Sequence, residues 1–300
     1  MINAVMAAGT HASRQEADTT SAQKLAQMRT ALLHKCVYVD FVERFCDDVR
    51  NIHTLMPSLV RQMDHETEEP MDQDRQMHWK QSLVALASVL RQAGLTKQII
   101  LLEYSLPKAD RHGQPPRMDA LILGQNIFGQ HSASIIELKG WDSITGESKR
   151  PGMVWVMRNG SAREEIHPTR QAAGYILSLK GLLNICGVRK DFLTTQAFVY
   201  LYNIRHTLSP EVSTALFGGK STPLRLLVSL NTGLYAGELA NKLRRSVGKG
   251  AGIVALERLL EVHHRAKKLC DESKGGEEVI GNPLGERTRK KIAELLRRVK

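Results

Sequence analysis

The sequence has 300 residues, a length that commonly holds about two domains, and its net charge is +11. Hydrophobic residues make up 42% of the chain and charged residues 24%, which is enough apolar material for a sizeable core and excludes a wholly disordered protein. No run approaches the roughly 18 consecutive apolar residues of a membrane span, so we expect none.

Apolar spacing predicts the elements in chain order. Spacings of three and four favour helices, short runs rich in Ile, Leu, Val and Tyr favour strands, and polar stretches with Gly or Pro favour loops. The expected helices are Ala26–Met63, His78–Gln92 and Thr169–Leu183, the last opened by His167-Pro168. The expected strands are Lys97–Leu106, Arg117–Leu123, Ser134–Lys139, Met153–Gly160 and Thr195–Tyr202, and the expected linker and loops are Asp64–Arg75, Gly124–Ala133 and Asp142–Gly152. From Ser209 onward, helical periods alternate with Gly-rich breaks.

This order predicts an α/β fold with a mixed sheet flanked by helices and with helical additions at both ends. We expect three parts: a helical segment at residues 1–75, a core at residues 76–205, and a basic helical region at residues 206–300.

The cysteines point to a reducing compartment. The four cysteines lie far apart and form no CxxC pair, so neither a zinc cluster nor a disulfide framework is expected. The opening residues MINAVMAAGT lack the basic region and the apolar run of a secretory signal. We therefore expect a cytoplasmic protein with no membrane partner.

Positive charge is concentrated near the end of the sequence. From residue 241 to residue 300 there are 16 Lys or Arg against 8 Asp or Glu. Such an excess favours a polyanion such as nucleic acid, although a solvated basic surface fits equally well. Residues 287–300 form a predicted amphipathic helix, whose Arg289, Lys290 and Arg297 would face a phosphate backbone.

One predicted strand carries charged residues in a pattern that indicates a catalytic metal site. Glu137 and Lys139 are two apart in an apolar strand, so both project from the same face. Asp119, on the preceding strand, lies beside Glu137 if the two strands pair. Two adjacent carboxylates suit Mg²⁺, and a lysine beside that ion would orient or deprotonate water and offset charge on a phosphorane. The alternative is an ion pair on an edge strand.

The segments RMDALILG, SIIELKGW and HPTRQAAGY resemble the PD-(D/E)XK nuclease superfamily, which has a restriction-endonuclease-like fold. More narrowly, residues 76–205 resemble the amino-terminal region of bacterial Schlafen-type AAA helicase proteins. The resemblance implies a Mg²⁺ ion, or Mn²⁺, held by Asp119, Glu137 and Leu138. It also implies a catalytic Lys139. The same resemblance makes Glu103 an auxiliary acid and Gln171 a polar group on the helix that faces the site.

We therefore expect metal-dependent hydrolysis of nucleic acid, most simply DNA, with a role in bacterial defence or DNA repair. The alternative is a catalytically silent module of the same fold that binds nucleic acid or a separate helicase or ATPase subunit. A homodimer is compatible with either function. Arg117 would either steer a phosphate or pair with an acid, and the sequence leaves both open.

Overall fold

The computed structural model describes residues 19–32, 35–67, 70–106, 117–189, 191–206, 208–209, 227–230 and 233–275. Residues 19–32 are helical. The elements that follow are β1 (Tyr38–Phe41), α2 (Val42–Arg50), α3 (Ile52–Thr67), α4 (Gln73–Gln92), β2 (Ile99–Ser105), β3 (Arg117–Gln125), β4 (His131–Lys139), β5 (Ser143–Glu147), β6 (Met153–Arg158), β7 (Ser161–Ile166), α5 (Pro168–Ile185), β8 (Thr194–Leu201), β9 (Leu227–Leu230), α7 (Gly233–Val247) and α8 (Gly252–Gly275).

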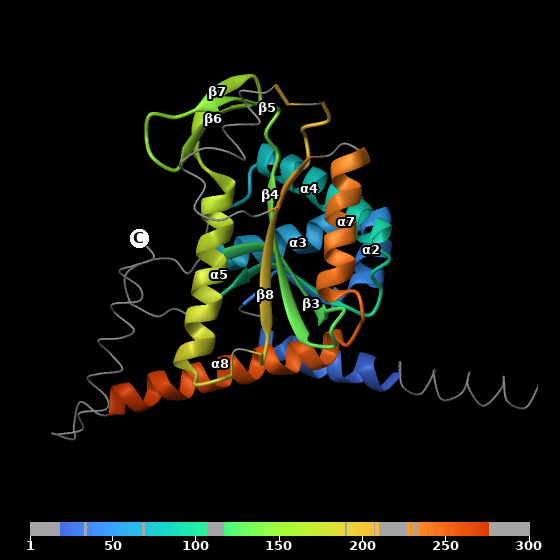
Figure 1. Cartoon of the computed structure of the whole chain (residues 1–300). Helices are drawn as coiled ribbons and strands as arrows, with labels where there is room; N and C mark the ends of the chain where they lie inside the picture. Colours follow the sequence, from blue (N-terminus) through green and yellow to red (C-terminus); the bar gives the residue numbers. More distant parts are fainter. Residues whose placement is uncertain are drawn as a thin grey trace, which may run out of the picture.

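A six-stranded mixed sheet forms the centre of the molecule, in the order β1-β2-β3-β4-β8-β9. Strands β1 to β4 pair antiparallel, whereas β4, β8 and β9 run parallel to one another. Parallel strands need a crossover, and α5 supplies it between β4 and β8. Figure 1 shows β4 and β8 side by side between α5 and α7.

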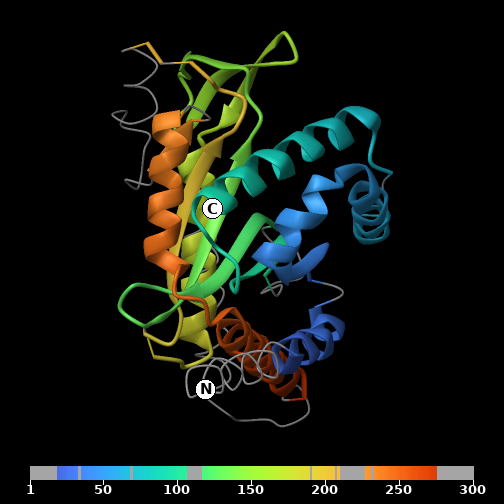
Figure 2. The same cartoon turned by 90° about the vertical axis from the view of Figure 1, so that its right-hand side faces the viewer.

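Helices cover both faces of this sheet and create two hydrophobic cores. One core joins α5, α8 and the helix at residues 19–32 to side chains such as Leu101, Leu121 and Ile135. The other joins α2, α3, α4 and α7 to Ile122 and Ile136 on the opposite face. Figure 2 looks onto this face, with α7 (orange) to the left of α4 (teal) and of α2 and α3 (blue). The fold is therefore α/β, with a mixed sheet flanked by helices, as the sequence predicts.

A second sheet of three strands, β5-β6-β7, is inserted between β4 and α5. It lies beyond the end of β4 and the start of α5 (Figure 1). Val154 and Val156 on β6 are fully buried, in the same core as Trp141. Asn159 and Gly160, which join β6 to β7, both have positive φ, as a tight hairpin turn requires.

Most of the strongly patterned predictions are confirmed. Strands β2, β3, β4, β6 and β8 and helices α4 and α5 occupy the expected regions, and Pro168 is in the first turn of α5. Among the described residues, no helix is long and apolar enough to cross a membrane.

Four predictions of local structure are wrong. The single helix Ala26–Met63 is interrupted by β1, because a short apolar segment pairs with β2 instead of continuing the helix. The linker Asp64–Arg75 contains the end of α3 and the start of α4. The loop Asp142–Gly152 contains β5, which β6 stabilises by pairing. The loop Gly124–Ala133 is shorter than expected, because β3 and β4 pair as far as Gln125 and His131.

The segment after β4 packs closely against β8. The Tyr202 amide donates to the Lys139 carbonyl at 3.1 Å, and the Asn203 side chain donates to the Gly140 carbonyl at 3.2 Å. A Cβ at Gly140 would lie 2.3 Å from the Tyr202 hydroxyl oxygen. A residue with a side chain would therefore push the two strands apart just beyond Lys139.

We predict that Gly140→Ala destabilises the fold by about 1–3 kcal/mol, the usual cost of overpacking. Tyr202→Phe removes the closest atom, so the double variant should lose less stability than the sum of the single variants. Urea denaturation measures these differences. As a control, Gly174→Ala in α5, where a Cβ meets nothing within 4 Å, should stabilise by about 0.5–1 kcal/mol. Full additivity of the Gly140 and Tyr202 variants would contradict the contact.

Candidate metal centre

Glu137 and Lys139 lie at the end of β4 on the face that α5 covers. Ile135, two residues earlier, is in the same core as Tyr175 of α5, while Leu138 packs against the opposite core. Glu137 is only 1% exposed, and its Oε1 is 2.8 Å from the Lys139 ammonium, whose side chain is 17% exposed. The carboxylate is therefore buried, while the lysine that pairs with it still reaches solvent.

Asp119 lies beside this pair because β3 and β4 are antiparallel. Ala120 is opposite Ile136, and continuing this register by one residue puts Asp119 opposite Glu137. Asp119 Oδ2 accepts a hydrogen bond from the Leu138 amide at 2.7 Å. The structure thus brings the two predicted carboxylates together on neighbouring strands, at one end of the sheet.

Helix α5 adds two polar groups to the cluster. His167 caps the helix by accepting from the Thr169 amide, and Pro168 begins it. One turn later, Gln171 Oε1 accepts from the Lys139 ammonium at 3.0 Å. Gln171 Nε2 donates to the Tyr175 hydroxyl at 2.8 Å. The predicted residue Gln171 is therefore directed at Lys139, and its amide orientation is fixed from both sides.

Burial dominates the electrostatics of the two carboxyl groups. Burial, then the neighbouring Glu103, raises the pKa of Asp119 to about 7, against the opposing effect of Lys139. Burial, then Asp119, raises the pKa of Glu137 to about 8. For Lys139, burial lowers the pKa, but the attraction of Glu137 and Asp119 outweighs it, so the pKa lies above its ordinary value. The lysine therefore holds its proton at neutral pH.

Glu103 belongs to the neighbouring strand β2 and is close enough for its charge to act on Asp119. Its φ is +51°, a left-handed conformation that is unusual for a residue other than glycine and often marks a functional site. Arg117 pairs with the Glu103 carboxylate at 3.7 Å and contacts the Met63 sulfur at 3.0 Å. Of the two alternatives for Arg117, the structure shows the pairing with an acid, and a contact with phosphate stays a prediction.

The donor atoms fit a small divalent cation. Glu137 Oε2 is buried and has no hydrogen-bond partner among the described residues. Two carboxylates with main-chain oxygen suit Mg²⁺, which usually takes one or two protein carboxylates and keeps waters. Leu138 has an apolar side chain, so only its main-chain carbonyl could serve as a ligand. Within the described ranges, no three side chains of His, Cys, Asp or Glu form a group that could hold a metal by themselves.

Three predicted residues are not among the described ones, and one residue near the site was not predicted. Arg289, Lys290 and Arg297 fall outside the described residues. Trp141 is 1% exposed, with the Lys139 ammonium 6.0 Å from its ring centroid, so it packs beneath the lysine. The contact of Tyr202 with Gly140 was not predicted, because it depends on β8 being the parallel neighbour of β4. In the sequence, the only indication of this contact is that both strands are followed by polar segments.

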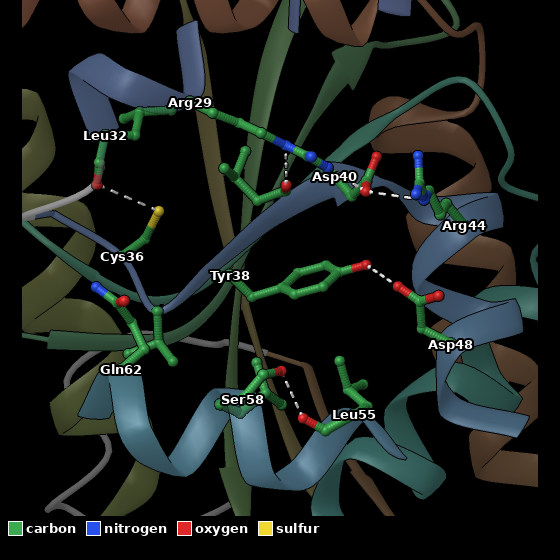
Figure 3. A pocket seen from close by; sticks show the side chains of 13 residues that line it. Arg29, Leu32, Cys36, Tyr38, Asp40, Arg44, Asp48, Leu55, Ser58 and Gln62 are labelled. Atoms are coloured by element: carbon green, nitrogen blue, oxygen red, sulfur yellow. Dashed lines mark hydrogen bonds and ion pairs between the residues drawn. The ribbon is translucent and has the colours of Figure 1, made fainter. Parts of the chain in front are cut away.

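A separate cavity of about 410 Å³ lies beside β1, and none of the predicted site residues lines it (Figure 3). Arg29 pairs with the buried Asp40 there and also donates to the Val39 carbonyl at 3.2 Å. Arg44 lies 3.4 Å from the same carboxylate, which also accepts from the Phe41 amide. These side chains satisfy main-chain groups of the edge strand β1, a role that explains their presence without a ligand.

Comparison of the chain with models of protein families, with curated proteins and with solved structures finds no match.

The raised carboxyl pKa values predict that stability falls as pH rises. The ordinary pKa values are 3.8 for Asp119 and 4.5 for Glu137, against about 7 and about 8 in the fold. Between these limits the folded protein binds more protons than the unfolded chain, so the free energy of unfolding decreases with increasing pH. Thermal denaturation in EDTA should show this decrease, with a shallower slope for Asp119→Asn.

The matched control for that measurement is Asp47→Asn on α2, an exposed carboxylate paired with Arg50. This variant should keep the pH slope of the wild type. A melting temperature that does not decrease from pH 6 to pH 9 would contradict the buried, proton-binding pair.

Proposed function

We propose that the chain is a metal-dependent nuclease that hydrolyses phosphodiester bonds of DNA, with a restriction-endonuclease-like core. The observation that supports this proposal most is the buried pair of carboxylates next to a single, solvent-accessible lysine. The sheet with α5 on one face, which brings Asp119, Glu137 and Lys139 together, is compatible with such a core. The resemblance to the PD-(D/E)XK superfamily supports the same function.

In this proposal Asp119, Glu137 and the main-chain carbonyl of Leu138 hold Mg²⁺ or Mn²⁺. The ion would supply positive charge to the phosphate and polarise it for attack by water. Binding of a cation requires both carboxyl groups to lose their protons, which their raised pKa values resist. Cation affinity should therefore increase with pH.

Lys139 acts in this mechanism as a charged hydrogen-bond donor. Because its pKa is raised, its ammonium would donate to a phosphate oxygen and offset the negative charge that develops there. Gln171 accepts one ammonium hydrogen, and Tyr175 fixes the amide of Gln171. The ammonium is thereby aimed by two neighbours, and Trp141 closes the space beneath it.

Incubation of the purified protein with plasmid, linear duplex and single strands tests the proposal directly. We predict cleavage with Mg²⁺ and none with EDTA. Lys139→Ala should reduce the rate about 10²–10⁴-fold, the usual contribution of such a group, while the protein stays folded. Lys180→Ala, on the exposed face of α5, is the matched control and should keep the wild-type rate.

Two results would count against this proposal. Cleavage of DNA by Lys139→Ala at the wild-type rate would reject the role of the lysine. Binding of DNA without Mg²⁺-dependent cleavage by the wild type would favour the alternative, a silent module of the same fold that holds nucleic acid or a helicase partner.

A further inference from the structure

Arg158, at the end of β6, is a half-buried cation that has no hydrogen bond or ion pair among the described residues. Residues two apart in a strand face the same side, so Arg158 follows the buried Val154 and Val156 toward the body of the protein. Its guanidinium forms no hydrogen bond or ion pair with the described residues. Seven other arginines, by contrast, are paired with acids: Arg29, Arg44, Arg50, Arg117, Arg150, Arg189 and Arg265. A partly buried cation without a counter-charge favours an anion.

Arg158 lies close to the candidate metal centre. The Asp142 amide donates to the Met157 carbonyl at 2.9 Å, and the Asn159 amide donates to the Asp142 carboxylate at 2.8 Å. These bonds tie the residues on both sides of Arg158 to a position three residues after Lys139. The pKa of Tyr202 agrees with this placement. Burial raises it to about 12, Arg158 lowers it and Asp119 raises it, so the charges of Arg158 and Asp119 both act on the same hydroxyl group.

Arg205 follows the end of β8, two residues after the last residue that is bonded to the end of β4. Tyr202 and Asn203 are hydrogen-bonded to the main chain of Lys139 and Gly140, so the segment that follows β8 leaves the sheet beside the end of β4. Arg205 is exposed, and it too forms no hydrogen bond or ion pair within the described part of the chain. Arg158 and Arg205 thus both adjoin main chain that is hydrogen-bonded to the segment from Lys139 to Asp142, and among the described residues neither has a polar partner.

We propose that Arg158 and Arg205 bind backbone phosphates of the nucleic acid that neighbour the phosphate being cleaved. This inference rests on the proposed nuclease function, and it assigns the binding of the substrate backbone to residues that no motif of the sequence indicates. Arginine suits this role because its planar donors match phosphate oxygens. The Asp142 carboxylate accepts the Asn159 amide and forms no ion pair with Arg158 or Arg205 among the described residues, and the Arg170 guanidinium donates to the Pro151 carbonyl at 3.1 Å.

Fluorescence anisotropy in EDTA tests the inference without cleavage. A labelled DNA duplex is titrated with the wild type and with Arg158→Gln/Arg205→Gln across a series of salt concentrations. The double variant should bind more weakly, and the slope of log K against log salt should fall by about 0.9 for each phosphate contact removed. Arg189→Gln/Arg265→Gln, which loses the same charge from two paired arginines away from the site, should keep the wild-type slope.

Thermal denaturation confirms that each variant is folded before its slope is interpreted. An unchanged slope in Arg158→Gln/Arg205→Gln overturns the inference, and Mg²⁺-dependent cleavage by the wild type would show that the nuclease itself still stands. An equal decrease in both double variants also overturns it, because net charge alone would then explain binding. Failure of the wild type to bind DNA at low salt and to cleave it with Mg²⁺ overturns both proposals.

Discussion

Glu137 is buried at the end of a central strand beside a second carboxylate, and one lysine is its direct counter-charge. A buried charge costs several kcal/mol unless it is paired and hydrogen-bonded, and one oxygen of Glu137 lacks any such partner among the described residues. Burial accordingly raises the pKa of Glu137 to about 8, so the carboxyl group takes up a proton near neutral pH when no cation is bound. A divalent cation would relieve the repulsion between Glu137 and Asp119, and the proposed function therefore depends on that ion.

Residues around the two carboxylates fix the position of the Lys139 side chain. Gln171 and Tyr175 come from α5, whose start is set by His167 and Pro168, while Gly140 allows β4 and β8 to approach closely. The lysine ammonium is therefore held by residues from two different elements. Such preorganisation is what a site needs to stabilise charge as it develops on a phosphate. In the proposed function, the burial that raises the carboxyl pKa values also holds the lysine in position.

The sequence predicted the central elements well, because their apolar patterns are long and regular. The side-by-side placement of Glu137 and Lys139 followed from the alternation of a strand, and Gln171 followed from helical spacing. The strand β1 was mistaken for helix, because its few apolar residues suit either structure until β2 pairs with them. Tyr202 and Arg158 could not be found, since their positions depend on which strands become neighbours rather than on any local pattern.

Titration of the protein with Mg²⁺ by calorimetry, at pH 6 and pH 8 and in buffers of different ionisation enthalpy, tests the central claim most directly. We predict saturable Mg²⁺ binding with higher affinity at pH 8 than at pH 6. Binding should release protons, because the cation displaces them from Asp119 and Glu137. Glu137→Gln should abolish that binding. Absence of Mg²⁺ and Mn²⁺ binding by the folded wild type at pH 8, or equal binding by Glu137→Gln, would contradict it.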